Sequence, residues 1–458
     1  MTKTNIIILA AGKGTRMRSA LPKVLHKLAG RSMLSHVVAA TATIAEAKRI
    51  IVTGHGAEKV EREFANTEHI FVQQKDQLGT AHAVQMAVPH LGDQGKVLVL
   101  YGDVPLILPS TINDILNTVT DRSMGLLTIH LDQPDGYGRI VRGQDGAIAS
   151  IIEQKDATAE QLKITEVNTG VLALEAWQLK DWLPQITNNN AQGEYYLTDL
   201  IAIARDNGVE VCSVHPKSAT EVEGVNNRIQ LSQLERAHQR QQAEILMSSG
   251  TTLADPERFD QRGELTAGTD NFIDINCVFE GSVVIGSGVS IGPNCIIINS
   301  TLGDGVEIKA NTIVEESIVG DRAIVGPFAR LRPRTVLGSD TKIGNFVETK
   351  NTEVGKGSKI NHLSYVGDAE LGENVNIGAG TITCNYDGAN KHKTALGDNV
   401  FVGSNSTLVA PITVADGGFV GAGSTLTGDV PKDALAVSRA KQRNIGGWKR
   451  PTKNNKGD

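Results

Sequence analysis

An aliphatic residue recurs at every sixth position in the C-terminal half of the chain, and this period constrains the fold more than any other feature. The step is unbroken through Leu396, Val402, Leu408, Val414, Val420 and Leu426. A period of six fits neither the helix repeat of about 3.6 nor the strand repeat of about 2. It is typical of a hexapeptide solenoid, in which short parallel strands coil into a prism and one aliphatic side chain per hexapeptide points inward.

The same step runs upstream, from about Cys277 to Val430, with slips of five residues at Ile297→Leu302 and Val314→Val319. The largest interruption is the polar segment 385–394, just before the clean run resumes. Solenoids accept slips at their corners and release longer insertions as loops that often carry function. We therefore expect residues 385–394 to leave the solenoid as a functional loop.

Composition agrees with a chain of this kind. Forty-eight glycines suit tight corners, and an aromatic content of 4% suits an aliphatic interior. A length of 458 residues predicts two or three domains. A net charge of −6 gives no overall attraction to nucleic acid or acidic membranes. Four widely spaced cysteines without a CxxC pair argue against zinc and disulfides and favour a reducing cytoplasm, and no stretch is long enough to span a bilayer.

The N-terminal half reads as alternating strands and helices up to about residue 227. Ile6–Leu9, Ile50–Thr53 and Val97–Leu100 are predicted strands, and Ser32–Ala47 is a predicted helix between them. This alternation predicts a mostly parallel sheet with helices on both faces and ligands at the carboxyl ends of the strands. Residues 228–250 have helical apolar spacing and predict an amphipathic connecting helix, after which residues 251–458 form the solenoid and a basic tail.

The residues that follow two of the predicted strands are candidates for binding phosphate or a metal ion. The glycine-rich loop from Leu9 to Met17 could admit a phosphate to its backbone N–H groups at the start of the next helix, or it could be only a tight strand–helix turn. It lacks the Lys-Ser/Thr of a P-loop and the third glycine of a dinucleotide fingerprint. Asp103, after the third strand, is either a magnesium ligand or a helix cap, and its position alone favours neither.

Several motifs together resemble a known family. Leu9–Met17 with Pro22-Lys23, the segment from Gln74 to Thr80, and Tyr101-Gly102-Asp103 are similar to sugar-nucleotide pyrophosphorylases. With the solenoid, nearly the whole chain resembles the bacterial bifunctional enzymes that join an N-acetylglucosamine-1-phosphate uridyltransferase to a glucosamine-1-phosphate N-acetyltransferase. The resemblance implies a Rossmann-like pyrophosphorylase domain over 1–227, a linker helix over 228–250 and a left-handed parallel β-helix acetyltransferase domain over 251–458. It also implies a cytoplasmic enzyme that makes UDP-N-acetylglucosamine for peptidoglycan and lipid A.

For uridylyl transfer, the resemblance implies that Arg16 and Lys23 balance charge on the phosphates of UTP. It implies that Gly138, Glu153 and Asn168 hold the N-acetylated sugar. Asp103 and Asn226 would bind Mg²⁺. The full set of residues implied for the nucleotide and its sugar is Leu9, Ala10, Ala11, Gly12, Lys23, Gln74, Gly79, Thr80, Tyr101, Gly102, Asp103, Gly138, Glu153, Asn168 and Asn226.

For acetyl transfer, the resemblance implies that His362 is the general base. The residues implied for the sugar phosphate are Arg332, Lys350, Tyr365, Asn376 and Lys391, the last reaching into the site of an adjacent subunit. The residues implied for acetyl-CoA are Ala379, Asn385, Tyr386, Ser404, Ala422 and Arg439. The basic tail from Arg439 onward could cover coenzyme A phosphates, bind nucleic acid or remain solvated.

Two other readings of the chain stay open at this point. A pyrophosphorylase with one activity would use the solenoid only to oligomerise, and a nucleotide-exchange subunit of a translation initiation factor would share the two-part plan without catalysis. The segment from His362 to Tyr365 disfavours the first, and the intact loop with Asp103 disfavours the second. Flat prism faces predict a cyclic homotrimer. The resemblance implies small-molecule substrates only, without nucleic acid or membrane.

Overall fold

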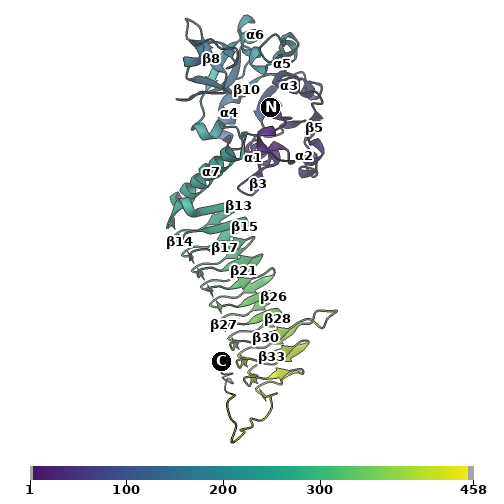
Figure 1. Cartoon of the computed structure of the whole chain (residues 1–458), viewed down its shortest axis with the longest axis vertical. Helices are drawn as coiled ribbons and strands as arrows, with labels where there is room; N and C mark the ends of the chain where they lie inside the picture. The colour runs from purple at the N-terminus through teal and green to yellow at the C-terminus, as the bar shows by residue number, and fades with distance from the viewer. Residues whose placement is uncertain (1–3, 452–458) are drawn as a thin grey trace, which may run out of the picture. The chain divides into compact units, whose positions relative to one another are not determined.

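The structure is a computed structural model that describes residues 4–451. The chain divides into two compact units, Met1–Gln239 and Arg240–Asp458, and each is described by itself (Figure 1). The first unit is an α/β domain and the second is a parallel β-helix, as the periodicities predict. No helix among the described residues is long and apolar enough to cross a membrane.

A nine-stranded sheet forms the centre of the first unit. Its main path runs β11-β7-β10-β6-β1-β4-β5, and β8 and β9 lie off this path. The bounds of its strands are β1 (Thr4–Ala10), β4 (Lys48–Thr53), β5 (Ile70–Gln73), β6 (Lys96–Tyr101), β7 (Ser123–His130), β8 (Arg139–Arg142), β9 (Ile148–Ile152), β10 (Glu166–Glu175) and β11 (Glu210–Val214). The three predicted strands are β1, β4 and β6, which pair in parallel and have buried centres because helices cover both faces.

Strand β10 departs from the predicted parallel order. It pairs antiparallel to both β6 and β7, and its register shifts between Asn168 and Leu172. The sheet is therefore mixed, with a reversed strand in its middle. The shift is an irregularity of the bulge type, which commonly occurs beside a binding site because it changes the direction of side chains.

Helices surround this sheet, but the first is shorter than predicted. Their bounds are α1 (Met33–Ala40), α2 (Ala57–Glu63), α3 (Thr80–Ala87), α4 (Pro109–Asn117), α5 (Ala176–Trp182) and α6 (Leu200–Asp206). The prediction of a helix through Ala47 is wrong. The helix ends at Ala40 because the hydroxyl of Thr41 donates back to the carbonyl of Val38, and Arg49 donates to the Thr41 carbonyl that a longer helix would use.

Helix α7 (Arg228–Ser248) confirms the helix predicted over 228–250. In the first unit Glu235 accepts from the backbone N–H of Ala29, and Leu234 is buried. In the second unit Ala243 and Leu246 join the β-helix core. The apolar spacing was partly misleading, since Ile229 and Ile245 are exposed.

Two long parallel sheets build the second unit. One has 11 strands: β12 (Thr251–Leu253), β14 (Asn271–Ile273), β16 (Ser290–Ile291), β19 (Glu307–Ile308), β22 (Ile324–Val325), β25 (Lys342–Asn345), β27 (Lys359–His362), β29 (Asn376–Ile377), β32 (Phe401–Val402), β35 (Phe419–Val420) and β37 (Leu435–Ala436). The 15-stranded sheet contains the intervening strands, among them β15 (Cys277–Ile285), β21 (Ser317–Val319), β23 (Arg330–Leu331), β26 (Glu348–Val354), β28 (Tyr365–Leu371), β30 (Ile382–Cys384) and β31 (Thr394–Leu396). Along the chain, strands of one sheet follow strands of the other, and one full circuit forms one coil of the β-helix.

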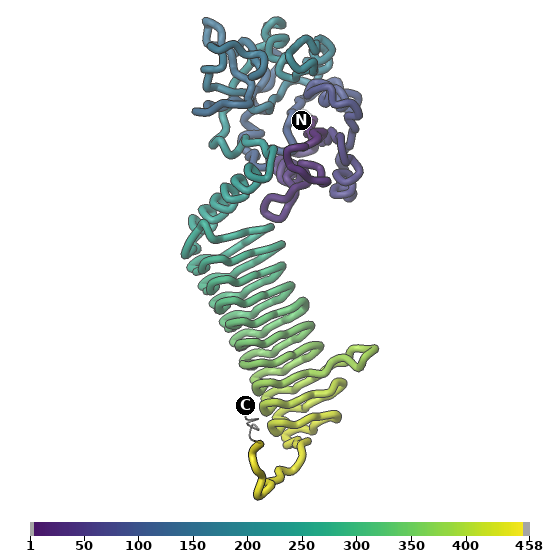
Figure 2. Tube along the Cα trace, in the orientation of Figure 1, coloured from purple at the N-terminus to yellow at the C-terminus, as the bar shows by residue number. Residues whose placement is uncertain are grey.

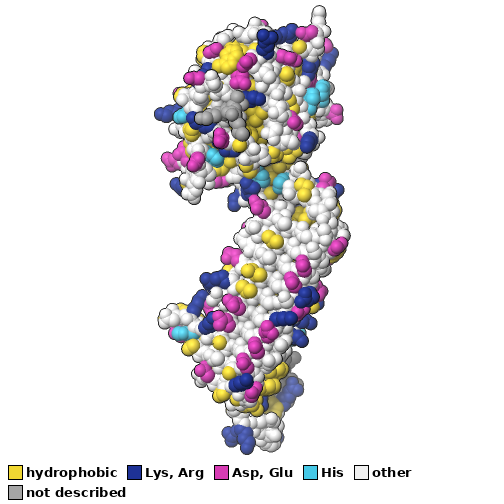
Figure 3. Space-filling view, turned by 180° about the vertical axis from the view of Figure 1, so that it is seen from behind, with side chains coloured by type: hydrophobic (Ala, Val, Ile, Leu, Met, Phe, Trp, Pro, Cys, Tyr) yellow, Lys and Arg dark blue, Asp and Glu magenta, His cyan; other side chains and the backbone are white. Residues whose placement is uncertain are grey.

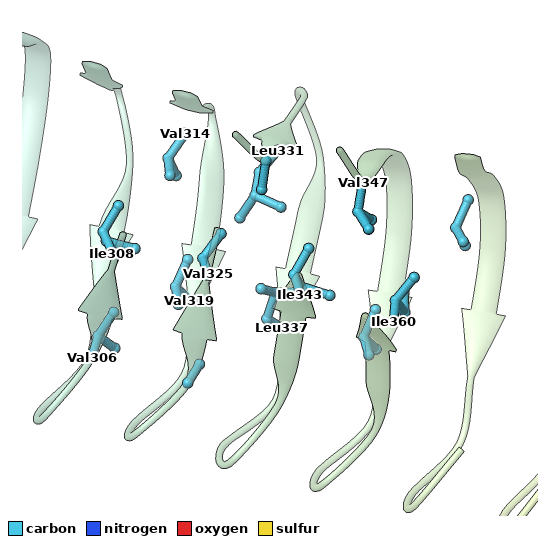
Figure 4. Close-up of a cluster of buried hydrophobic side chains, with 14 of the residues drawn as sticks. Val306, Ile308, Val314, Val319, Val325, Leu331, Leu337, Ile343, Val347 and Ile360 are labelled. Carbon is cyan, nitrogen blue, oxygen red and sulfur yellow. The ribbon is translucent and has the colours of Figure 1, made fainter. Parts of the chain in front are cut away.

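The hexapeptide positions form the interior of these coils. Ile308, Val325, Ile343 and Ile360 pair in register on successive strands of the 11-stranded sheet, and each is at most 1% exposed. Figure 4 shows these side chains stacked from coil to coil. The five-residue slips keep both flanking residues inward, so they shorten a corner without changing the register of the core.

Segment 385–394 leaves the coils as predicted. Figure 2 shows a hairpin that projects from the stack between β30 and β31. An antiparallel bridge joins Tyr386 to Lys391, and Asp387 accepts hydrogen bonds from the backbone N–H groups of Ala389 and Asn390. The hairpin is therefore held by its own hydrogen bonds. Over the face of the β-helix in Figure 3, acidic and basic side chains are interspersed, without a stripe of one sign.

The β-helix core gives the first test. Ile343→Ala should destabilise the coils around β25 by about 3 kcal/mol, because it leaves a cavity in a fully buried ladder. Ile318→Ala makes the same chemical change at a side chain that is 54% exposed, and should cost at most about 0.5 kcal/mol. Denaturant-dependent hydrogen exchange of peptides from 320–380 measures both. Equal effects of the two changes would contradict the interior ladder.

Candidate functional sites

A pocket of about 350 Å³ opens at the carboxyl ends of β1 and β6. It brings together most of the residues predicted for the nucleotide. These are Leu9, Ala10, Ala11, Gly12, Lys23, Gln74, Gly79, Thr80, Tyr101 and Asp103. Parallel pairing explains this, because β1 and β6 end side by side, and the backbone N–H of Gly102 donates to the carbonyl of Leu9 over 2.9 Å. Gly102 itself does not line the pocket but joins its two walls.

Polar amides form one end of this pocket. Gln74 is buried and donates through Nε2 to the carbonyl of Gly79 over 3.1 Å. Gln77 donates through Nε2 to the carbonyl of Ala11, which connects the loop after β5 to the loop after β1. Gly79 has a φ of 119°, and a Cβ there would lie 2.5 Å from the carbonyl oxygen of Tyr195. Only glycine fits that position, and the turn places Thr80 at the start of α3 in the pocket wall.

Cations and oxygen ligands meet around Lys23 and Asp103, which line the pocket, whereas Arg16 and Asn226 do not line it. The ammonium of Lys23 forms an ion pair with Asp103, and it also lies 3.3 Å from Oδ1 of Asn226. Arg16 donates to the same Oδ1 over 2.8 Å. The backbone N–H of Val225 donates to the carbonyl of Asp103, and this bond holds the segment around Asn226 against the end of β6. Four predicted residues that are far apart in sequence therefore form one polar cluster.

The loop after β1 differs from its prediction in one respect. It leads into a single turn of 3₁₀ helix, Thr15–Met17, and not into an α-helix. Such a short turn has no substantial macrodipole, so the expected attraction of a helix N-terminus for phosphate does not apply. Gly14 is required here, because its φ is 59° and a Cβ would lie 2.7 Å from Cβ of Lys23. What this loop offers to an anion is therefore its backbone N–H groups and the side chains of Arg16 and Lys23.

The three predicted sugar residues, Gly138, Glu153 and Asn168, do not line this pocket. The carbonyl of Gly138 accepts from the backbone N–H of Asn168 over 2.9 Å, and a Cβ at Gly138 would lie 3.5 Å from Oε1 of Glu153. Burial, and then the charges of Asp103 and Glu153, raise the pKa of Tyr101. Burial also raises the pKa of Glu153, which accepts from the hydroxyl of Thr198 over 3.2 Å. Tyr101 is thus near enough to both Asp103 and Glu153 for their charges to act on it.

The structure adds pocket residues that were not predicted as ligands. These are Val24, Gln77, Ala83 and Glu194. Gln77 and Glu194 belong to segments that carry the family resemblance, so that signal was present, although no single residue could be chosen from it. Val24 and Ala83 are apolar side chains whose place in the wall follows only from the tertiary fold.

A second cluster forms on the 15-stranded sheet of the β-helix. Leu331 pairs with Thr349, and Thr349 pairs with Val366. The residues that come next, Arg332, Lys350 and Gly367, therefore occupy the same position on three successive coils. The guanidinium of Arg332 donates to Glu348 over 2.7 Å, and this hydrogen bond raises the pKa of Arg332. The in-register pairing thus places two predicted phosphate-binding cations on neighbouring coils.

Lys391 in the hairpin extends this cationic cluster. The charges of Lys391 and then of Arg332 lower the pKa of Lys350. The structure therefore places Lys391 beside Lys350 of its own chain. Three cations on one surface favour an anion there, because an anion offsets the repulsion between like charges.

Tyr365 lies next to these cations on β28. A Cβ at Gly367 would lie 2.4 Å from its hydroxyl oxygen, so the ring occupies space that only glycine leaves free. Asn385 donates to the Tyr365 hydroxyl over 3.4 Å and also to Asp368. Asp368 accepts in addition from Asn351 over 2.6 Å. This network connects the start of the hairpin to the cluster.

His362 is exposed at the end of β27, and Asn345 on the preceding coil orients it. Nδ1 of His362 lies 2.7 Å from Oδ1 of Asn345, and the two residues pair in register. An amide oxygen only accepts, so Nδ1 carries the proton and Nε2 keeps a free lone pair. The ring therefore presents a base to solvent. Asn345 was not predicted, and nothing in the sequence distinguishes it from other corner asparagines.

The residues predicted for acetyl-CoA follow His362 along one corner. The N–H of Gly380 donates to the carbonyl of His362, that of Asn405 to the carbonyl of Ala379, and that of Gly423 to the carbonyl of Ser404. Arg439 then donates to the carbonyl of Ala422 over 2.7 Å. Ala379, Ser404, Ala422 and Arg439 thus form a row.

Two residues predicted for acetyl-CoA lie off this row, because Asn385 is at the start of the hairpin and Tyr386 is exposed on it. Asn376, which was predicted for the sugar phosphate, pairs with Lys359 and not with His362.

Comparison with known proteins agrees with both halves. A family model described as a MobA-like NTP transferase domain matches residues 6–143, and one described as a GMPPB C-terminal domain matches residues 262–347. Curated relatives named bifunctional protein GlmU are similar to the whole chain. The relative from Marinobacter nauticus is 58% identical, and the match covers 99% of this chain and 100% of the relative. The relatives from Cellvibrio japonicus and Stutzerimonas stutzeri are 56% and 55% identical. Each of these two matches covers 98% of this chain and 99% of the relative.

The fold and sites thus define a protein in which a nucleotidyltransferase-type α/β domain precedes a parallel β-helix. At this identity over both full lengths, the chain belongs to the bifunctional GlmU family.

The cationic cluster gives a second test. Lys391→Met should raise the pKa of Lys350, because it removes the largest cause of its depression. Lys393→Met is the matched control on the same hairpin, since Lys393 pairs with Glu370 and does not act on Lys350. Competitive labelling of lysines across a pH series, read by mass spectrometry, reports the pKa of Lys350. An unchanged value in the Lys391 variant, or an equal rise in the control, would contradict the cluster.

Proposed function

We propose that this chain catalyses two transfers that make UDP-N-acetylglucosamine. The first moves acetyl from acetyl-CoA to the amine of glucosamine-1-phosphate on the β-helix. The second joins N-acetylglucosamine-1-phosphate to the uridylyl group of UTP in the α/β domain and releases pyrophosphate. The observation that carries this proposal is the 58% identity with a bifunctional GlmU protein over both full lengths. The two separate polar clusters, one in each unit, support it.

In the uridylyl step, the phosphate oxygen of the sugar attacks the α-phosphorus of UTP in line, and pyrophosphate leaves. This reaction needs positioning and charge balance and no protein nucleophile. Arg16 and Lys23 would balance the charge of the phosphates at one end of the pocket, and Gln74, Gly79 and Thr80 would hold the uridine at the other. Gly138, Glu153 and Asn168 would hold the sugar beyond Tyr101.

Asp103 and Asn226 would hold Mg²⁺ in this domain. Their oxygens fit the ion, because both already converge on one cation, the ammonium of Lys23, and both are hard oxygen ligands. Among residues 4–451 no cluster of three or more His, Cys, Asp or Glu side chains could hold a metal, so the site would rely on one carboxylate, one amide and substrate oxygens. When bound, Mg²⁺ supplies further neutralisation of the phosphate charge.

In the acetyl step, the amine nitrogen of the sugar forms a bond to the thioester carbon, and the thiolate of coenzyme A leaves. The amine must lose a proton, and Nε2 of His362 would accept it, since Asn345 keeps the proton of the ring on Nδ1. Arg332 and Lys350 would bind the sugar phosphate, and Tyr365 and Asn376 would contact its ring. Lys391 would reach across to the site of an adjacent subunit. Acetyl-CoA would lie along the corner of Ala379, Ser404, Ala422 and Arg439, near Asn385 and Tyr386.

We further propose that the protein acts as a cyclic homotrimer. Beside His362 three bulky side chains follow on one corner of successive coils: Phe328, Phe346 and Leu363 are 50%, 57% and 63% exposed. The two phenylalanine rings stack with centroids 5.3 Å apart. All three residues have φ between 52° and 56°, a conformation that costs a residue with a Cβ about 1–2 kcal/mol.

Several other coils place asparagine or glycine at this corner, for example Asn311, Asn405 and Gly423. The apolar stripe is exposed and held in a strained conformation next to the proposed catalytic base, which supports a role as a contact surface for another protein. A second copy of the same chain fits this role. The substrates are small molecules. Free cysteines throughout the described residues suit a reducing cytoplasm, where the product would enter synthesis of peptidoglycan and lipid A.

The separation of the two activities can be tested with two variants. His362→Ala should lower acetyl transfer by about 10²–10⁴-fold and leave uridylyl transfer from N-acetylglucosamine-1-phosphate unchanged. Asp103→Ala should do the reverse, because it removes the only carboxylate of the proposed metal site. Coenzyme A release and pyrophosphate release measure the two reactions separately. Each variant is the other's control, and loss of both activities in one folded variant would contradict the division.

The apolar stripe gives a separate test of assembly. Phe346→Asn should weaken the trimer, since it removes an exposed ring and replaces it with a residue that tolerates the left-handed backbone. Phe401→Asn changes a stacked and 38% exposed phenylalanine that lies on strand β32 and not at this corner; it is the control and should leave the trimer intact. Sedimentation velocity over a concentration series measures assembly. If Phe346→Asn dissociates no more readily than wild type, the stripe is not the contact.

A further inference from the structure

Three polar residues follow one another at the corner of the β-helix from which the hairpin leaves. Asn351 and Asp368 occupy the same corner position on successive coils, and each has a φ of 48°. Asn385, where the hairpin begins, follows at this position on the next coil. The carboxylate of Asp368 therefore lies between two amides.

Asp368 accepts a hydrogen bond from each of these amides. Its Oδ1 accepts from Nδ2 of Asn351 over 2.6 Å, and its Oδ2 accepts from Nδ2 of Asn385. An ionised carboxylate has only acceptors, so each contact is a hydrogen bond in one orientation of the amide and a repulsion between two oxygens in the other. Asp368 therefore selects the orientation of Asn385.

The selected orientation leaves Oδ1 as the group that Asn385 can offer to a ligand. Nδ2 donates to Asp368 and also to the hydroxyl of Tyr365 over 3.4 Å, so both of its hydrogens have an acceptor. Among the described residues no hydrogen bond reaches Oδ1, and this atom is not buried. An oxygen here complements the amide N–H groups in the pantetheine arm of coenzyme A. A reversed amide would present hydrogens to them instead.

We propose that Asp368 is a positioning residue for acetyl transfer, which turns the amide oxygen of Asn385 toward an N–H group of acetyl-CoA. The inference rests on the proposed acetyl transfer and adds the residue that sets the direction of one coenzyme contact. Each oxygen of the Asp368 carboxylate already accepts from an amide, so Asp368 acts through Asn385 and not on a substrate.

The charge of Asp368 has a different effect on the sugar phosphate. The charges of Lys391 and then of Arg332 lower the pKa of Lys350, and the charge of Asp368 acts against them. The carboxylate is thus near the cations proposed to bind the phosphate, and its negative charge opposes an anion there. Loss of this charge should therefore weaken the coenzyme contact without weakening the phosphate contact.

The kinetics of coenzyme A release in the full-length protein separate these two contacts. Asp368→Asn leaves one acceptor between two amide donors, so KM for acetyl-CoA should rise by roughly 3- to 10-fold, the effect of about one neutral hydrogen bond. KM for glucosamine-1-phosphate should not rise. Asp340→Asn is the matched control, because Asp340 also has a left-handed backbone, with a φ of 61°, but pairs with Arg322. It should change neither KM.

An exchange of the two groups gives a stricter test. Asn385→Asp alone sets two carboxylates face to face and should also raise KM for acetyl-CoA. With Asp368→Asn in the same chain, the new amide donates to the new carboxylate, whose other oxygen remains an acceptor for the coenzyme. The double variant should therefore have a lower KM for acetyl-CoA than either single variant.

KM does not depend on the folded fraction of a preparation. If Asp368→Asn does not fold, Asp368→Gly suits the same backbone, removes both acceptors and carries the same expectation. An unchanged KM for acetyl-CoA, an equal rise in both KM values, or additive effects of the two exchanged groups overturns the inference. The proposed function fails in a different way, namely if the wild-type protein releases no coenzyme A from acetyl-CoA and glucosamine-1-phosphate.

Discussion

In-register parallel pairing decides which side chains meet in both units. In the β-helix it repeats one position of a coil on the next coil, so an aliphatic residue stacks on an aliphatic residue along the interior. The same pairing acts on the outside, where it brings Arg332 beside Lys350. A core period and a functional surface thus arise from one geometric rule. In the α/β domain, the parallel β1 and β6 bring Leu9 beside Tyr101, and this places two loops at one pocket.

This rule explains why so much could be predicted from the sequence. The period of six predicts the interior residues and the coils, because every coil presents the same position to the core. The break at 385–394 predicts the hairpin, since a polar segment cannot fill an aliphatic position. Asp103 and Lys23 were predicted from the resemblance, and the structure joins them in an ion pair although 80 residues separate them.

The missed features depend on contacts between segments that local patterns do not contain. The apolar spacing of 32–47 continues past Ala40, but Arg49 takes the Thr41 carbonyl and ends the helix. The reversal of β10 leaves no mark in its composition, because a buried antiparallel strand and a buried parallel strand are both apolar on two faces. Asn345 resembles every other asparagine of the β-helix until the next coil places His362 over it.

Two histidine–amide pairs show how the same groups serve opposite purposes. At His362 an amide oxygen accepts from Nδ1, so the amide orients the ring and leaves Nε2 free to accept a proton. At His82 the amide nitrogen of Gln74 donates to Nδ1, and the carbonyl of Gly79 accepts from the same nitrogen, so the amide sets the tautomer of the ring and Nε2 keeps its proton. The two rings therefore hold different tautomers, each fixed by one contact with its partner amide. One arrangement leaves a free lone pair on Nε2, and the other leaves a proton there.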